Sequence, residues 1–293
     1  MNLILRVSSR RHASKLEIGD FRRIAARIDR RFAHEPRRLE VEDRELGGLP
    51  TRFIRPVGGE VRGTLFVLHG GAWCIETPNL HSGLAGRLAV ELGFEAVLPS
   101  YRLAPEHPFP AGLEDCITAW RAWTEAGGVP RRCVLVGDSA GGALALALMG
   151  ELRNGGAEQP GCALLLSPAT DLTSMGRSVV DNERSDVMFG IAALMLMRHW
   201  YLGEHNPTDP RASPYWGDFT GFPPLLFQVS GSEMLLDSSR LASAKARRQG
   251  VTTQLSVWPG MPHDFTLFGF LPEARAGIRE QIRFIREHLP DGT

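Results

Sequence analysis

The chain has 293 residues, which is enough for one domain with a large hydrophobic core. Its 33 Lys and Arg residues balance 33 Asp and Glu residues, so the overall charge favours neither nucleic acid nor a membrane surface as a partner. No run reaches the roughly 18 apolar residues of a membrane span, and Arg6 interrupts the apolar start before it could serve as a signal peptide. Four scattered cysteines lack metal-ligand spacing, so we expect buried, unpaired thiols in a cytoplasmic protein.

An Arg-rich segment opens the chain and contains an apolar stripe. Apolar residues recur in it at spacings of three and four: Ile18, Phe21, Ile24, Ile28 and Phe32. This spacing predicts an amphipathic helix, and Pro36 predicts its end. Two roles fit the pattern equally well, a surface helix packed on the body of the protein or a helix that covers an active site.

A β-hairpin and a series of buried strands follow. Alternating residues at 39–46, the Gly47-Gly48 turn and residues 51–55 predict a hairpin at a sheet edge. Short apolar runs predict further strands at 64–68, 95–98, 133–136, 162–166, 225–229 and 253–257. Helical patterns lie between several of them, for example at 113–124. This order favours an α/β fold with a mostly parallel sheet covered on both faces.

The interval between residues 166 and 225 is longer than one crossover needs. It contains a nearly all-apolar, helix-like run at 187–202 with Met188, Met195 and Met197. A core helix is one interpretation. We favour an insertion folded over an active site, because such folds place their sites at the carboxyl ends of the strands and methionines make adaptable pocket walls.

The most informative stretch is Gly137-Asp138-Ser139-Ala140-Gly141-Gly142, between the apolar run 133–136 and the helix formers at 143–149. A serine on a sharp strand–turn–helix connection exposes its Oγ, and flanking glycines let neighbouring backbone come close. The new helix also directs free N–H groups at developing negative charge. We therefore predict that Ser139 is a nucleophile rather than part of a structural turn.

A second motif, His69-Gly70-Gly71-Ala72-Trp73, directly follows the strand 64–68. Small residues there let backbone N–H groups turn toward the serine, as in an HGGG-type oxyanion hole. We expect Gly70, Gly71 and Ala72, together with Ala140, to form that hole. His69 precedes the serine in the chain, so we interpret it as a structural residue that holds the loop.

With these two motifs, the Pro-rich segment 101–111 makes the chain resemble the hormone-sensitive-lipase-like family of bacterial carboxylesterases. The resemblance spans roughly residues 40–290. It implies an eight-stranded α/β-hydrolase core, residues 39–174 and 213–293, and a helical cap from residues 1–38 and an insertion at 175–212. It also implies carboxylic ester substrates and no cofactor. Ala72 stands where the family has a third glycine; its N–H is retained, so we expect a small effect.

The base and the acid of a catalytic triad are expected later in the chain, in the order serine, acid, histidine. The segment 259–265 matches the family's histidine motif and makes His263 the general base. An unperturbed histidine predicts loss of activity below about pH 6 to 7. Two carboxylates compete for the acid. The family's register falls on Glu233, and Asp237 is expected in the first turn of the next helix, so we favour Glu233.

Together these features predict a serine carboxylesterase that cleaves short- to medium-chain esters of small molecules through an acyl-enzyme. The same triad would serve a deacetylase, an amidase or a lactone hydrolase with a dedicated metabolite. A non-catalytic receptor is disfavoured because His263 is retained, and an interfacial lipase because no broad apolar lid is evident. The sequence leaves the oligomeric state open, with a homodimer as the form considered.

Overall fold

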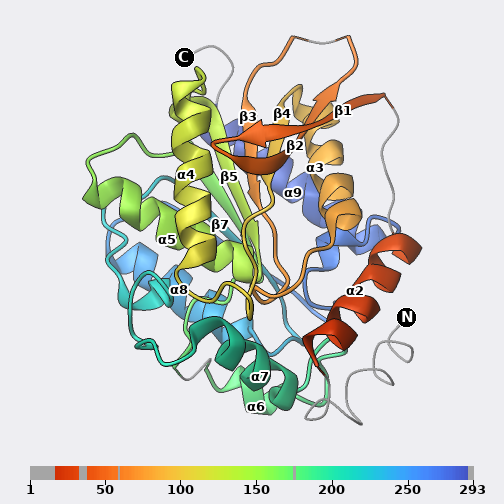
Figure 1. Ribbon diagram of the computed structural model, residues 1–293, viewed down its shortest axis with the longest axis vertical. Helices are drawn as coiled ribbons and strands as arrows, with labels where there is room; N and C mark the ends of the chain where they lie inside the picture. Colours follow the sequence, from red (N-terminus) through yellow and green to blue (C-terminus); the bar gives the residue numbers. More distant parts are fainter. Residues whose placement is uncertain (1–16, 33–37, 59, 174–175, 290–293) are drawn as a thin grey trace.

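The computed structural model describes residues 17–32, 38–58, 60–173 and 176–289. Within them the chain forms one mixed sheet (Figure 1). Its strand order is β1-β2-β4-β3-β5-β6-β7-β8. β1 pairs antiparallel with β2 and β2 antiparallel with β4, whereas the remaining neighbours are parallel. The strands are β1 (Leu39–Leu46), β2 (Leu49–Pro56), β3 (Thr64–Leu68), β4 (Glu95–Pro99), β5 (Cys133–Asp138), β6 (Cys162–Leu166), β7 (Leu225–Ser230) and β8 (Thr253–Trp258). The eight-stranded α/β expectation and the edge hairpin are confirmed.

Helices cover both faces of this sheet. The described helices are α2 (Ile18–Phe32), α3 (Pro78–Leu92), α4 (Ala111–Glu125), α5 (Ala140–Asn154), α6 (Ser178–Asp181), α7 (Ile191–Leu202), α8 (Leu236–Arg248) and α9 (Pro272–His288), with short 3₁₀ turns η2 (Pro130–Arg132), η3 (Pro214–Trp216) and η4 (Phe265–Leu267). Helices α4, α5 and α8 lie on one face, and α3 and α9 on the other (Figure 1).

The apolar strands supply a core on each face because successive side chains of a strand point to opposite sides. In β3, Phe66 and Leu68 belong to the core under α4 and α5, whereas Leu65 and Val67 belong to the core under α3 and α9. All four side chains are buried. A strand that is buried on both faces has no polar alternation, which is why residues 65–68 of β3 and 133–136 of β5 are continuous apolar runs in the sequence.

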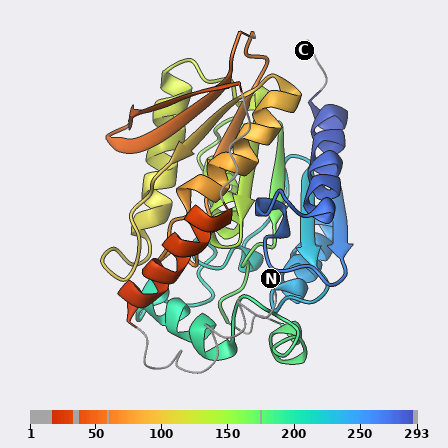
Figure 2. The same cartoon turned by 90° about the vertical axis from the view of Figure 1, so that its right-hand side faces the viewer.

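Helices α2, α6 and α7 lie together at the end of the sheet where the parallel strands finish (Figures 1 and 2). One predicted boundary is wrong: the helix expected at 187–202 begins at Ile191. Asp186 Oδ1 accepts the N–H groups of Met188 at 2.8 Å and Phe189 at 3.2 Å, and this turn replaces the first helical residues.

Two charged residues of α2 fix that helix to the body. The Arg22 guanidinium bonds both carboxylate oxygens of Glu106 at 2.7 Å, and its Nε donates to the Cys74 carbonyl at 2.9 Å. Asp29 is buried and accepts the backbone N–H of Leu80 at 2.8 Å, in the first turn of α3. A carboxylate at a helix N-terminus is favourable because free N–H groups and the positive end of the dipole meet there. The helix is therefore docked at both ends.

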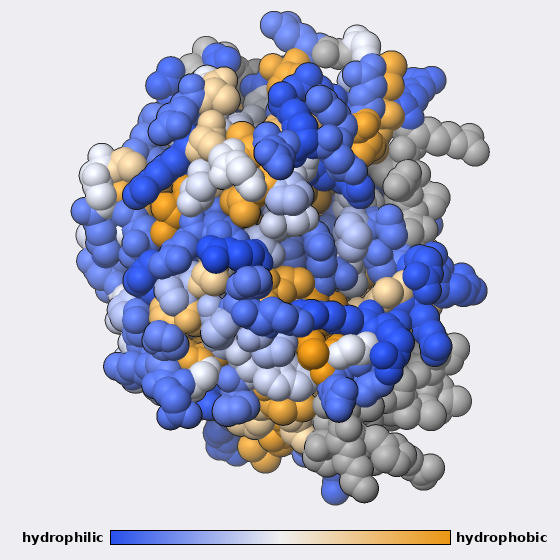
Figure 3. Space-filling model, viewed as in Figure 1, coloured by the Kyte–Doolittle hydropathy of each residue, from blue (hydrophilic) through white to orange (hydrophobic). Residues whose placement is uncertain are grey.

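Several sequence expectations concern individual residues. All four cysteines are free and buried, as expected. Of the predicted first cap segment, 1–38, the structure describes residues 17–32 and 38, so the helix end predicted at Pro36 lies outside the described residues. Among the described helices none is long and apolar enough to cross a membrane. On the face shown in Figure 3, apolar residues form small separate groups among polar ones.

Candidate active site

Ser139 lies on the turn between β5 and α5 with φ 50° and ψ −116°, a conformation that costs free energy in a non-glycine residue. Its backbone N–H donates to the Leu166 carbonyl at 2.7 Å, which ties the turn to the neighbouring strand. The flanking glycines are required. A Cβ at Gly141 would lie 1.9 Å from the Leu68 carbonyl oxygen, and one at Gly137 would lie 2.3 Å from the Gly141 carbonyl oxygen. Crowded backbone thus imposes the strained conformation of Ser139 on this turn.

The loop after β3 brings backbone N–H groups to the same place. Gly71 has φ 113°, Ala72 has φ 52° and Trp73 has φ 59°, so the chain runs through three successive residues with positive φ. A Cβ at Gly71 would lie 2.1 Å from the Ile75 carbonyl oxygen, whereas Ala72 accommodates its methyl group. The N–H groups of Gly71, Ala72 and Ala140 donate to no other described residue. They are available for an oxyanion.

The sequence predicts that Gly70 also donates in the oxyanion hole, but its N–H is not free. Its N–H donates to Asp138 Oδ1 at 3.0 Å, so this amide is already occupied. A Cβ at Gly70 would lie 2.2 Å from Asp138 Oδ2, which shows how closely the loop packs on the turn. The sequence prediction for Gly70 is therefore wrong: this residue connects the loop after β3 (residues 69–73, the oxyanion loop) to Asp138, the residue before the serine, and is not a free donor.

Asp138 also forms a buried ion pair that the sequence did not reveal. His81 Nε2 of α3 lies 3.0 Å from Asp138 Oδ2, and both side chains are 3% exposed. Burial alone lowers the pKa of His81, but the Asp138 charge outweighs it and raises that pKa to about 9. The pKa of Asp138 is lowered, because the His81 charge and the bonds to it outweigh the upward effect of burial. The charged pair ties α3, the oxyanion loop and the serine turn together.

His69 has the structural role expected for it. Its ring stacks on Tyr101 with centroids 4.2 Å apart, and its Nδ1 lies 2.7 Å from the Gly70 carbonyl oxygen. The Tyr101 hydroxyl donates to the His69 carbonyl at 2.7 Å. Burial, followed by the nearby His81 charge, lowers the pKa of His69. These contacts hold the start of the oxyanion loop.

The structure brings His263 and Glu233 together from loops after β8 and β7. His263 Nδ1 lies 3.0 Å from Glu233 Oε1, and both side chains are buried. The other carboxylate oxygen accepts from Ser167 Oγ at 2.8 Å and from the Ser230 N–H at 3.0 Å. Glu233 is thus held by three contacts in the orientation that directs one oxygen at the imidazole.

Asp237, the competing carboxylate, lies elsewhere. It is in the first turn of α8, where its Oδ2 accepts the Ser178 N–H at 2.9 Å, and it pairs with Arg240 at 3.6 Å. No contact joins Asp237 to His263 within the described residues. Of the two carboxylates, Glu233 contacts the His263 imidazole, whereas Asp237 contacts Ser178 and Arg240.

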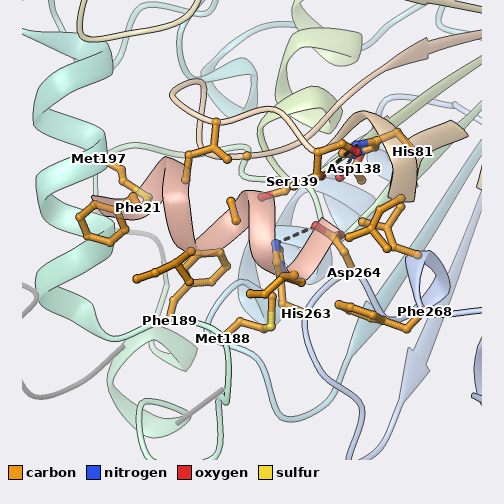
Figure 4. A pocket seen from close by; sticks show the side chains of 18 of the residues that line it. Phe21, His81, Asp138, Ser139, Met188, Phe189, Met197, His263, Asp264 and Phe268 are labelled. Carbon is orange, nitrogen blue, oxygen red and sulfur yellow. Dashed lines mark hydrogen bonds and ion pairs between the residues drawn. The ribbon is translucent and has the colours of Figure 1, made fainter. Parts of the chain in front are cut away.

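A second carboxylate faces the other nitrogen of His263. Asp264 Oδ2 lies 2.9 Å from Nε2, the atom that a base would direct at Ser139, and Figure 4 shows this ion pair on the cavity wall. Burial lowers the pKa of His263, but Asp264 and then Glu233 outweigh it and hold that pKa well above its usual value. Burial raises the pKa of Asp264 to about 7, although the His263 charge opposes this.

The segment before α7 supports the loop that carries Glu233. Asn182 Nδ2 donates to the Glu233 carbonyl at 2.8 Å, and Asp186 Oδ2 accepts the Met234 N–H at 2.9 Å. Through its Oδ1, Asp186 also holds Phe189, whose ring meets His263 edge-on with centroids 5.2 Å apart. Sequence reasoning missed Asn182 and Asp186, because nothing in a linear pattern relates them to a loop about 50 residues later.

An apolar cavity of about 150 Å³ opens beside Ser139 and His263 (Figure 4). Phe21, Ile24 and Ile28 of α2 form one wall, and Met188, Phe189 and Met197 form another. Helix α2 is docked on the body and also lines this cavity. Ser139, His263 and the free amides meet at a site that fits a small apolar molecule.

Comparison with known proteins defines the class to which this site belongs. A family model described as alpha/beta hydrolase fold matches residues 65–267. An acetyl-hydrolase of Streptomyces hygroscopicus is 36% identical, with 84% of this chain and 83% of that protein covered, and an esterase of Acinetobacter venetianus is 32% identical, with 80% and 82% covered. The fold and the matched sequence together make the chain an α/β-hydrolase.

A solved structure narrows the class. An esterase from the bacterial hormone-sensitive lipase family superimposes with a TM-score of 0.92 at 33% identity, covering 98% of this chain and 96% of that one. The chain belongs to the hormone-sensitive-lipase-like carboxylesterases, and it is a carboxylic ester hydrolase.

Proposed function

We propose that the protein is a serine carboxylesterase in which Ser139, His263 and Glu233 form the triad and in which short- to medium-chain esters are cleaved through an acyl-enzyme. The observation that carries the proposal is the 3.0 Å contact between His263 and Glu233 beside a serine held at φ 50°. His263 would take the Ser139 proton during attack on the ester carbonyl and return it to the departing alcohol. Water would repeat the sequence on the acyl-enzyme.

The N–H groups of Gly71, Ala72 and Ala140 would hold the oxyanion, a contribution of about 3 to 4 kcal/mol for each donor. In this structure Nε2 of His263 faces Asp264, and Ser139 Oγ bonds to no described residue. Acylation then requires Nε2 to exchange Asp264 for Ser139. Catalytic hydrogen bonds commonly tighten only in the substrate complex.

We also propose that α2 and residues 176–212 form the cap of this enzyme and that residues 39–173 and 213–289 form its core. The docking of α2 by Arg22 and Asp29, and its place on the cavity wall, support the assignment. A cytoplasmic location belongs to the same proposal and is supported by the four free, buried cysteines. A homodimer stays a prediction from the sequence.

Turnover of p-nitrophenyl esters from acetate to palmitate tests the activity and its chain-length range. We expect the highest kcat/KM at the short end and a steep decline for long chains. A small amide and lactone panel, run beside it, tests the second candidate. That candidate, a deacetylase or related hydrolase with a dedicated metabolite, is favoured by the relative named acetyl-hydrolase. Faster cleavage of an acetamide or a lactone than of every ester would replace the first proposal by the second.

The pH profile is expected to reflect the two carboxylates around His263. Activity falls as the pH is lowered through the pKa of His263, because an imidazolium cannot accept the Ser139 proton. Since that pKa is raised, the acid limb lies above the range of about pH 6 to 7 that an unperturbed histidine gives. Asp264→Asn removes one anion and shifts the limb to lower pH. The measurement is kcat/KM against pH for both proteins, and an identical limb in the variant would contradict the role given to Asp264.

A further inference from the structure

Two unequal cavities meet at Ser139. The large cavity, of about 150 Å³, includes His263 and Gly71 in its wall, and the small cavity, of about 20 Å³, includes Ala72, Trp73 and Leu194. Ser139 borders both. Phe189 and Met197 also border both cavities. An ester bound at Ser139 would therefore extend into two compartments of different size.

The position of His263 decides which half of the ester enters which cavity. In the tetrahedral intermediate the leaving oxygen must face the imidazole, because the imidazole gives it a proton. The negative oxygen faces the free N–H groups between the two cavities. His263 lines the large cavity and not the small one. The alcohol therefore occupies the large cavity, and the acyl group occupies the small one.

The volumes of the two cavities limit the size of the acyl group and of the alcohol. A cavity needs roughly 10 to 15 Å³ to hold one water molecule, and an apolar cavity of about 150 Å³ holds a benzene ring. On this scale the small cavity holds about a methyl group, and the large one holds a ring-sized apolar group.

Part of the wall of the small cavity is tightly packed into the core. Trp73 of the small cavity is buried and stacks on Tyr201 with centroids 4.2 Å apart, and Leu235 is buried as well. These core residues cannot move aside without disturbing their own packing. The half-buried Phe189 and Arg198 complete the wall of the small cavity, and the half-buried Ile24 and Ile28 of α2 belong to the wall of the large one.

We propose that the substrates are esters of a very short acyl group, acetyl above all, with a bulky apolar alcohol of about the size of a phenylalkanol. The inference rests on the proposed serine esterase function and assigns a compartment to each half of the ester. It differs from a simple limit on total length, because two esters of equal size are distinguished by the side of the ester bond on which the bulk lies.

An isomeric pair of esters tests this inference. 2-Phenylethyl acetate and ethyl phenylacetate have the same atoms and similar unactivated alcohols, but the ring lies on opposite sides of the ester bond. We expect kcat/KM for 2-phenylethyl acetate to be higher by about tenfold or more, which corresponds to about 1.4 kcal/mol in the transition state. Equal values, or a preference for ethyl phenylacetate, would overturn the inference and leave the esterase intact. Hydrolysis of neither isomer, with p-nitrophenyl acetate still cleaved, would also overturn it. Cleavage of no ester at all would overturn the proposed function itself.

Two matched truncations assign the compartments. Leu194 lines only the small cavity and Ile24 only the large one. Leu194→Ala should shift the ratio of the two kcat/KM values toward ethyl phenylacetate by about tenfold, because it makes room on the acyl side. Ile24→Ala should not shift the ratio in that direction. Thermal unfolding of both variants checks the fold, and the ratio itself does not depend on the fraction of folded enzyme. An equal shift in both variants, or a shift in Ile24→Ala alone, would overturn the assignment.

Discussion

Replacement of Ser139 by alanine is expected to lower kcat for ester hydrolysis by roughly 10⁴-fold or more, because the acyl-enzyme can no longer form. The fold should persist, since the side chain is small and the hydrogen bond from the Ser139 N–H to Leu166 belongs to the backbone. The measurement is single-turnover and steady-state hydrolysis of a p-nitrophenyl ester, together with labelling by a fluorophosphonate probe that reacts with activated serines.

Ser243 offers a matched control. It is also buried, but it lies in α8 and its hydroxyl bonds only the Arg240 carbonyl among the described residues. Ser243→Ala should retain both turnover and labelling, whereas Ser139→Ala should lose both at a similar unfolding temperature. Substantial turnover in a folded Ser139→Ala enzyme would refute the proposed mechanism as a whole.

The second large effect is expected at Glu233, the proposed acid of the triad. Glu233→Gln keeps the shape of the side chain but removes the charge that orients His263 and stabilises its protonated form. We expect kcat to fall by roughly 10³- to 10⁴-fold. The amide can still accept the Ser230 N–H, so the loop should stay folded. Asp237→Asn is the matched variant, because its side chain lies against Ser178 and not against the imidazole.

Asp237→Asn should keep most of the activity and lose at most some stability, since an amide oxygen still accepts the Ser178 N–H while the pairing with Arg240 is weakened. Kinetics and thermal unfolding of the two variants, measured side by side, separate the two roles. A large kcat loss in Asp237→Asn with a small one in Glu233→Gln would transfer the acid to Asp237.

The inner strands β3, β5 and β6 could be predicted from sequence because they are buried on both faces and residues 65–68, 133–136 and 162–166 are therefore apolar without interruption. The edge strand β1 is exposed, and its alternation and the Gly47-Gly48 turn predicted it instead. Helix α3 was not predicted. It contains Gly83, Gly86 and the buried His81, so it lacks the polar face that usually marks a helix. The start of α7 was wrong for a related reason, since apolar residues 187–190 look helical until the side chain of Asp186 is seen to bond their N–H groups.

In the candidate site too, some residues could be identified from the sequence and others could not. Ser139, His263 and the oxyanion loop lie in short local motifs whose spacing is itself the signal. The pairing of His81 with Asp138 joins residues 57 positions apart on different elements, and no linear pattern records it. Asp264 directly follows His263 in the chain, but its contact with Nε2 depends on a left-handed backbone with φ 51° that the sequence does not specify.

The contacts of Asp186 limit how the substrate range of such an enzyme can be altered by mutation. Asp186 bonds both the backbone that presents Phe189 to the cavities and the backbone next to Glu233. Substitutions at residues 186–189 that reshape the cavity wall will also displace Glu233. Substrate selectivity and turnover rate therefore cannot be changed independently through this turn. Directed evolution for new esters should then succeed more readily through α2, which shares no such anchor with Glu233 among the described residues, than through residues 182–190.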